Sequence, residues 1–392
     1  MNADDRQKII NSFLKKGYQL DESILGFLQE NTSKTDGFIT YLQKTFPNTP
    51  TVTKTHLSKF LKENESSLKI LKTPQPATKP YTKESVLNYL QIRYDFIKNT
   101  LQKKMGLTGI TSINKIGRSR QFSLIGLLRE IYHDKRQLTV EDKTGTTRLD
   151  IDETVDTTSL VNDEVVGLIC TQEEDKAKIK NIVYPDVEIK RTIPTTKETN
   201  CVFLSDFHLG TLGKESYYEN YKKWCDNLDE NTIVFVLGGI STGEKHEEFL
   251  ERLPEQCIKV LLKNVSVQEK ENYILLDDPT TIDIGGITIL ITYGNYLDNY
   301  MNQFKSDIGE TIVNLIKKRH LNPTYNPNGA IYQNDPYLLD ITPDIIAIGS
   351  TGKPKAMNYK GITIISTGSF LTEPIYWNVD LSTRETLKVD FT

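Results

Sequence analysis

The sequence is poor in the residues from which many catalytic and metal centres are built. Its 392 residues include only 5 histidines and 4 cysteines. So few histidines nearly exclude a site that needs several imidazoles. The cysteines form no C-x-x-C pair, so we predict reduced core thiols rather than disulfides or a cysteine-built zinc site. They are Cys170, Cys201, Cys225 and Cys257.

Long apolar runs are also missing. The longest candidates, such as residues 233–237, fall far short of the roughly 18 residues that are needed to cross a bilayer. Asp4, Asp5 and Arg6 do not fit the start of a signal peptide. We therefore expect a cytoplasmic, nucleoid-associated protein without membrane contact, and the length favours two or three domains.

Composition and periodicity divide the chain into four parts, which predict a multidomain α/β and β protein. Residues 1–60 have apolar residues at helical spacing and are interpreted as an N-terminal helical domain. Residues 61–81 are rich in Ser, Thr, Lys and Pro, as a flexible linker is. Residues 82–195 combine a helix with five short β-type segments that suit an OB-type barrel. Residues 196–392 alternate Val/Ile/Leu-rich strands with helices, which is typical of an α/β layer architecture.

Charge is distributed unevenly along the chain. Residues 62–120 hold 12 Lys/Arg and 4 Asp/Glu, a balance of +8, whereas residues 141–188 hold 5 and 13, a balance of −8. A barrel that grips single-stranded nucleic acid is expected to have a basic groove with exposed aromatic residues, and most of this barrel is acidic. The pattern favours protein contact for the barrel and leaves the basic segment before it as a candidate for phosphate contact.

The sharpest local signal is the string S-D-F-H-L-G at residues 205–210, which follows an apolar strand directly. Asp206 and His208 can present a carboxylate and an imidazole on one side of a turn, as a metal ion requires. A structural Asp turn with an unrelated histidine gives the same string, so the motif by itself leaves both interpretations open.

This string resembles the first motif of calcineurin-like metallophosphoesterases. The wider chain resembles, more specifically, the small subunit of archaeal family-D DNA polymerase, which is related to the B subunits of eukaryotic replicative polymerases. The resemblance covers essentially residues 82–392. It rests also on V-E-D-K-T-G at 140–145, N-D-E-V-V-G at 162–167, V-Y-P-D-V at 183–187, K-R-H-L-N-P-T-Y at 318–325, T-P-D-I at 342–345 and S-T-G-S-F at 366–370.

The resemblance implies an α/β sandwich of the calcineurin-like type, in which Asp, Asn and His residues hold two metal ions. Two adjacent divalent ions need several anionic or imidazole donors and an open position for water. Asp206, His208 and Asn264 match the motifs of the family. The remaining positions lack the metal-binding side chains of the family: Gly239 replaces the bridging carboxylate, and Val265, Tyr293, Ser350 and Gly352 replace histidines.

The resemblance with these losses predicts a non-catalytic accessory subunit of a DNA polymerase complex. Such a subunit scaffolds the large catalytic subunit, meets DNA mainly through the complex, and has lost the 3′–5′ exonuclease site. We expect no cofactor and at most one weakly bound divalent metal. Two alternatives stay open: a residual single-metal phosphodiesterase or exonuclease, and an accessory protein with a different partner.

Overall fold

The computed structural model describes residues 3–30, 35–47, 49–57, 68–77, 82–104, 106–117, 119–173, 176–190, 192, 194, 196, 199–206, 215–228, 232–238, 251–254, 257–263, 273–326, 329–349, 352–370 and 372–391. The chain divides into two compact units, Met1–Lys69 and Ile70–Thr392, and each is described by itself. None of the helices in these ranges is long and apolar enough to cross a membrane.

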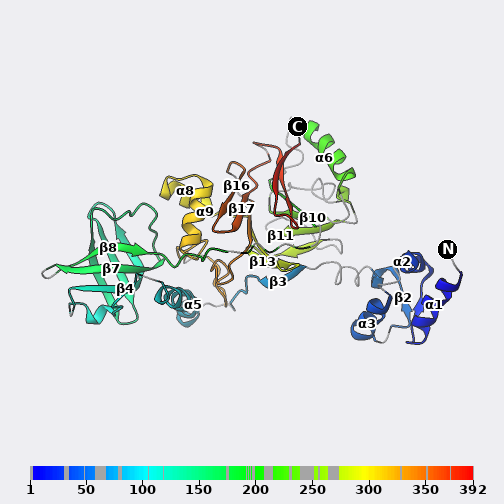
Figure 1. The fold of residues 1–392 in the computed structure, drawn as a ribbon, viewed down its shortest axis with the longest axis horizontal. Coiled ribbons are helices and arrows are strands. Elements are labelled where there is room, and N and C mark those ends of the chain that lie inside the picture. The colour runs from blue at the N-terminus through cyan, green and yellow to red at the C-terminus, as the bar shows by residue number, and fades with distance from the viewer. Residues whose placement is uncertain are drawn as a thin grey trace. The chain divides into compact units, whose positions relative to one another are not determined.

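The first unit is built around three short helices: α1 (Ala3–Leu14), α2 (Glu22–Glu30) and α3 (Thr35–Thr45). Two-residue strands, β1 (Gln19–Leu20) and β2 (Thr51–Val52), pair in parallel between them (Figure 1). The buried apolar side chains come from the three helices and from β2, and include Phe13, Ile24, Leu28, Phe38 and Val52. This unit therefore has a core of its own.

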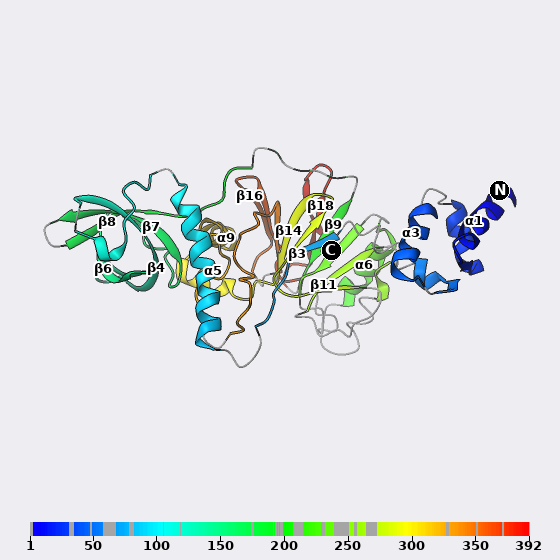
Figure 2. The ribbon, with the colours of Figure 1, turned by 90° about the horizontal axis from the view of Figure 1, so that it is seen from below.

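Helix α5 (Lys83–Gln102) begins with a capping box at Thr82. The Thr82 hydroxyl accepts a hydrogen bond from the Ser85 amide, and the Ser85 side chain accepts one from the Thr82 amide. The helix then runs alongside strands β4 (Gln121–Tyr132) and β7 (Val165–Glu173), as Figure 2 shows. Its buried face includes Tyr94, Ile97 and Leu101, which recur at helical spacing.

The predicted small barrel is confirmed as a closed five-stranded barrel. Its strands follow the order β4, β5 (Gln137–Asp142), β6 (Gly145–Ile151), β8 (Lys176–Val183) and β7. Strand β8 closes the barrel by pairing in parallel with β6 and antiparallel with β7. The approach of β5 to β4 requires a glycine at residue 126, because a Cβ there would lie 2.3 Å from Cγ1 of Val140.

The rest of the second unit contains two six-stranded sheets. The first has the order β12 (Ile274–Leu276), β11 (Ile258–Leu262), β10 (Thr232–Val236), β9 (Asn200–Leu204), β18 (Ile375–Asp380) and β19 (Thr386–Asp390). The second has the order β16 (Lys355–Tyr359), β17 (Ile362–Ser366), β15 (Ile345–Ile348), β14 (Ile287–Thr292), β13 (Thr280–Ile284) and β3 (Leu68–Lys72). Their central strands are parallel and almost entirely buried, which fits their Val/Ile/Leu-rich sequences.

Helices cover the outer faces of both sheets. Helix α6 (Glu215–Asp226) contributes Tyr221 and Cys225 to a cluster with Val202 of β9. Helices α8 (Leu297–Phe304) and α9 (Ile308–Lys317) pack on the second sheet. Between the sheets, the indole of Trp377 in β18 donates a hydrogen bond of 3.0 Å to the carbonyl of Ser366 in β17. The α/β architecture that the sequence predicts is therefore present as four layers.

One segment is more ordered than its composition indicates. Residues 68–77 lie within the segment that we interpret from the sequence as a linker, yet β3 pairs at the edge of the second sheet beside β13. Beyond β3, Thr73 Oγ1 lies 3.0 Å from Thr280 Oγ1, and the Ala77 amide donates to the carbonyl of Ile331. All four cysteines are free and buried, as the sequence predicts.

Candidate functional site

Asp206 lies where the central strands of the first sheet end. Its amide donates a hydrogen bond of 2.9 Å to the carbonyl of Gly238, which follows β10, and its backbone has a left-handed φ of 54°. The preceding Ser205 donates from its hydroxyl to the carbonyl of Gly349, at the end of β15. Strand ends of both sheets therefore meet at Ser205 and Asp206, and the Asp206 side chain is buried.

Tyr293 occupies this strand-end site from the second sheet. It follows β14, and its hydroxyl donates a hydrogen bond of 3.2 Å to Oδ1 of Asp206. Burial, reinforced by the negative charge of Asp206, raises the pKa of the phenol to about 12, so the phenol is a neutral donor at neutral pH. The sequence identified Tyr293 as the occupant of a lost histidine position, and the structure brings it into direct contact with Asp206.

The space around this contact is tight. A Cβ at Gly349 would lie 2.9 Å from the Ser205 hydroxyl and 3.1 Å from the Tyr293 ring. Glycine at this position is thus required by the close packing of the three strand ends. Gly352, a predicted lost-ligand position, lies against Gly368, where a Cβ would come within 3.0 Å of the Gly352 carbonyl oxygen.

The other predicted site residues lie outside the described part of the chain. They are His208, Gly239, Asn264, Val265 and Ser350. Within the described ranges, no group of three or more His, Cys, Asp or Glu residues has the arrangement to hold a metal ion. The predicted ligand set of Asp206, His208 and Asn264 therefore stays a prediction.

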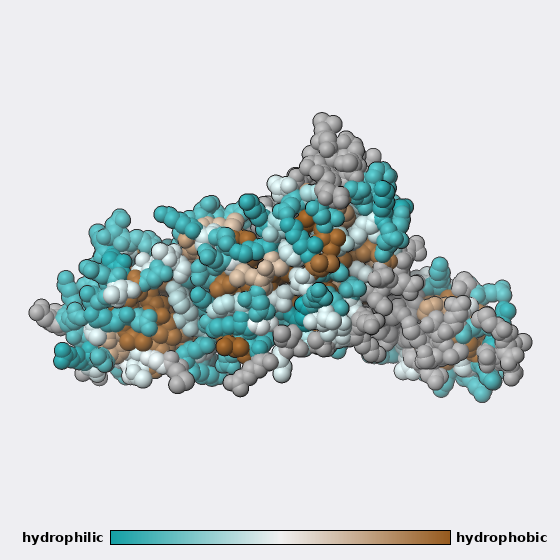
Figure 3. Space-filling view, turned by 45° about the horizontal axis from the view of Figure 1, so that its top comes forward, coloured by the Kyte–Doolittle hydropathy of each residue, from teal (hydrophilic) through white to brown (hydrophobic). Residues whose placement is uncertain are grey.

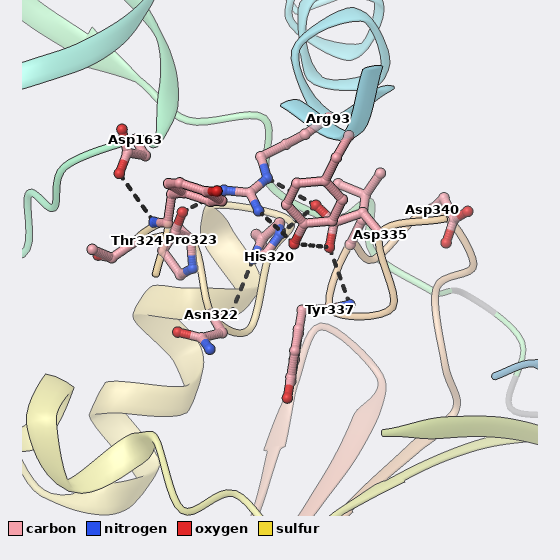
Figure 4. Close-up of polar contacts among 12 residues, drawn as sticks. Arg93, Asp163, His320, Asn322, Pro323, Thr324, Asp335, Tyr337 and Asp340 are labelled. Carbon is pink, nitrogen blue, oxygen red and sulfur yellow. Dashed lines mark hydrogen bonds and ion pairs between the residues drawn. The ribbon is translucent and has the colours of Figure 1, made fainter. Parts of the chain in front are cut away.

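A second concentration of polar groups lies where α5 meets the α/β part of the second unit (Figure 4). Arg93 and Asp335 form a fully buried ion pair, with Nε of Arg93 2.9 Å from Oδ2 of Asp335. Arg93 also donates to the carbonyl of Pro323 and to the hydroxyl of Tyr89. Because removal of either charge would leave the other buried and unpaired, this pair joins the two elements firmly.

His320 completes this network as a neutral side chain. Its Nδ1 accepts from the Asn322 amide at 3.0 Å, and Nε2 lies 2.9 Å from Oδ2 of Asp335. These partners require the proton on Nε2. Burial, together with the charge of Arg93, lowers the pKa of His320 to about 4. This geometry gives His320 a structural role in the network.

A second buried ion pair joins the barrel to the α/β part. Nζ of Lys318, just after α9, lies 2.8 Å from Oε2 of Glu164, just before β7, and both side chains are at most 2% exposed. The Val161 amide donates to the other oxygen of Glu164, and the Lys318 ammonium lies 4.6 Å from the centre of the Tyr184 ring. Nearby, the Tyr325 amide donates to Asp163.

Three segments on which the family resemblance rests therefore meet at this junction: 162–167, 183–187 and 318–325. Sequence reasoning missed the contacts among them and the role of Arg93. A usable signal was present, because Arg93 stands four residues after Tyr89 and four before Ile97, on the face of α5 that an amphipathic helix buries. A charged side chain on the buried face of a helix indicates that a residue of opposite charge is buried beside it.

The fold and the strand-end site define a multidomain protein in which a closed β-barrel is joined to a two-sheet α/β body. No protein-family model matches the chain. The chain is 22% identical over 347 residues to the DNA polymerase II small subunit of Archaeoglobus fulgidus, with 73% of this chain and 70% of that protein covered. It is 21% identical over 355 residues to the protein of that name from Methanothermobacter thermautotrophicus, with 74% and 73% covered.

These matches confirm the resemblance to the archaeal polymerase small subunit. Among solved structures, wild-type Vps29 of Entamoeba histolytica is 14% identical to the chain. That match covers 50% of this chain and 100% of Vps29, with a TM-score of 0.31.

Proposed function

We propose that this chain is the accessory small subunit of a family-D-like replicative DNA polymerase. The support is its similarity to curated small subunits over 73% and 74% of its length. In this role the chain scaffolds a large catalytic subunit and meets DNA mainly through the complex. The 196–392 part is then a calcineurin-like domain, and residues 82–195 supply a helix and an OB-type barrel.

The proposal includes the loss of exonuclease chemistry in this domain. The observation that carries this part is the hydrogen bond from Tyr293 to Asp206. A carboxylate that serves a two-metal site must face cations, whereas here Asp206 faces a protonated phenol. Gly239 in place of the bridging carboxylate supports the same conclusion, because a glycine has no side chain with which to bridge two ions.

The scaffold role is supported by the buried ion pairs of the second unit. A scaffold must hold its parts in a fixed geometry, and Arg93–Asp335 and Lys318–Glu164 each join elements that are far apart in sequence. Apolar surface for partners is also present: Figure 3 shows apolar areas among hydrophilic side chains, and Leu87, Ile189 and Leu387 are all more than half exposed.

The experiment has two arms. In the first, the tagged chain is isolated from its native cell, and we expect a large polymerase subunit to co-purify; its absence would favour an accessory protein with another partner. In the second, the purified chain is given a 3′-labelled single strand with Mn²⁺. We expect no removal of nucleotides, and robust removal that Asp206→Ala abolishes would overturn the loss of chemistry.

One observation favours a second candidate, a residual phosphodiesterase that uses a single metal at Asp206, His208 and Asn264. Asp206 keeps a left-handed backbone, and such sparsely populated conformations occur often at functional sites. Metal analysis of protein purified without chelator separates the two candidates. Stoichiometric Mn, Fe or Zn would favour the enzyme, and a metal-free protein would favour the accessory subunit.

A further inference from the structure

A basic cavity lies beside the C-terminal end of α5, away from the strand-end site. It has a volume of about 490 Å³ and is lined by the end of the helix, by residues that follow the barrel, and by Arg319 with Thr342. Its lining includes four cationic side chains, from Lys103, Lys104, Lys190 and Arg319. Two carboxylates also line it, Asp186 and Glu188.

Some of these charges are already neutralised. Asp186 accepts hydrogen bonds from the Tyr359 hydroxyl and the Lys360 ammonium, neither of which lines the cavity. Lys190 in turn is paired with Asp344 at 2.6 Å. When Asp186 and Lys190 are left out of the count because they are paired, the lining has three cations, Lys103, Lys104 and Arg319, and one carboxylate, Glu188. The cavity therefore keeps a net positive charge.

Arg319 is held in a defined orientation. Its guanidinium lies 5.6 Å from the centre of the Phe96 ring, and Nη1 donates to the Thr342 hydroxyl at 2.6 Å. The described residues include no carboxylate at ion-pair distance from it; the charges of Asp186, Asp340 and Glu188 act on it from farther away. A guanidinium that is stacked on an aromatic ring and has no carboxylate in direct contact is suited to bind a planar or tetrahedral oxyanion.

Lys103 and Lys104, at the C-terminal end of α5, add two further positive charges to that of Arg319. Lys104 donates to the backbone carbonyl of Asp186 at 3.0 Å, so its ammonium is positioned without being paired to a carboxylate there. Lys103 is exposed. An ammonium on a flexible stem binds phosphate as a point charge, which complements the directional donors of Arg319.

We propose that this cavity binds a phosphate group, supplied by a nucleic-acid backbone or by free phosphate. Arg319, Lys104 and Lys103 are the residues that bind it. The excess of 12 Lys/Arg over 4 Asp/Glu in residues 62–120, which contain α5, supports the same chemistry. The proposal does not depend on the polymerase assignment, because it rests on the cavity and on the charge of this part of the chain.

The test measures binding of a labelled single-stranded oligonucleotide to the full chain by fluorescence anisotropy, over a series of salt concentrations. The variant is Lys103→Glu, and the matched control is Lys83→Glu, which makes the same charge change on an exposed residue at the other end of α5. Loss of one phosphate contact weakens binding about fivefold at about 0.1 M salt and lowers the salt slope by about 0.7. We expect this for Lys103→Glu and not for Lys83→Glu.

A second arm separates the two sources of phosphate. Thermal unfolding of the wild type, Lys103→Glu and Arg319→Gln proteins is followed while inorganic phosphate is added at constant ionic strength. Stabilisation of the wild type alone, with oligonucleotide affinity equal in all proteins, identifies free phosphate as the ligand. If neither probe distinguishes Lys103→Glu from Lys83→Glu, or if neither binds the wild type, the proposal is wrong.

Discussion

The hydroxyl of Tyr293 donates a hydrogen bond to the carboxylate of Asp206 across the two sheets, over 3.2 Å. The two residues are 87 positions apart in the sequence, and each follows a buried strand. Asp206 is 2% exposed, so its carboxylate depends on protein donors for the stabilisation that water would otherwise give. The contact therefore contributes to stability at Asp206, one of the ligand positions that the sequence predicts.

Removal of this hydroxyl is expected to destabilise the second unit. In Tyr293→Phe the buried carboxylate loses a donor, which should lower the free energy of unfolding by about 1–2 kcal/mol. Urea denaturation checks this, with Tyr325→Phe as control, because among the described residues the Tyr325 hydroxyl makes no hydrogen bond and only its amide does. Equal stability of Tyr293→Phe and the wild type would contradict the role of the contact.

The sequence was sufficient to predict the buried strands of the two sheets, because their apolar residues form continuous runs. It was also sufficient for the barrel, because its five strands follow one another along the chain. It was not sufficient for β3, because Leu68–Lys72 is embedded in a Lys- and Pro-rich segment and its neighbour β13 begins about 200 residues later. Only the tertiary context makes this segment a strand.

The candidate site could likewise be predicted only in part from the sequence. A motif comparison placed Asp206 and Tyr293 at ligand positions one by one. Their mutual hydrogen bond could not be predicted, because it depends on how two sheets pack. The same reason applies to Arg93 and Asp335, which are 242 positions apart. The local sequence pattern indicates which polar residues are candidates for a site, and the tertiary packing determines which of them are in contact.

His320 should make stability depend on pH. Burial lowers its pKa from the usual 6.5 to about 4, so the unfolded chain binds a proton more readily than the folded one between these values. Stability is therefore full above pH 6.5 and falls as pH decreases toward 4, by up to about 3 kcal/mol. Urea unfolding of the wild type and His320→Gln across this range should show a shallower decline in the variant; parallel curves would contradict this origin.

The cysteines should be inert in the folded protein. Burial raises the pKa of Cys170 and of Cys225 to about 12, and the thiolate is the reactive form. A thiol reagent at pH 8 should therefore label none of the four cysteines rapidly in native conditions and all four in denaturant. Rapid labelling of the native chain, located by mass spectrometry, would show that the core around that thiol opens.

The pair formed by Glu164 and Lys318 provides the sharpest test of the junction between the barrel and the α/β part. Burial raises the pKa of Glu164 and lowers that of Lys318, and the charge of each partner is the main influence that opposes this shift in the other. Lys318→Met alone leaves a buried carboxylate without its cation and should cost about 3–5 kcal/mol. Glu164→Gln with Lys318→Met removes both charges, so it should recover much of that loss. Additive effects in this double-mutant cycle would show that the two side chains do not interact, and that the junction is held by its apolar contacts instead.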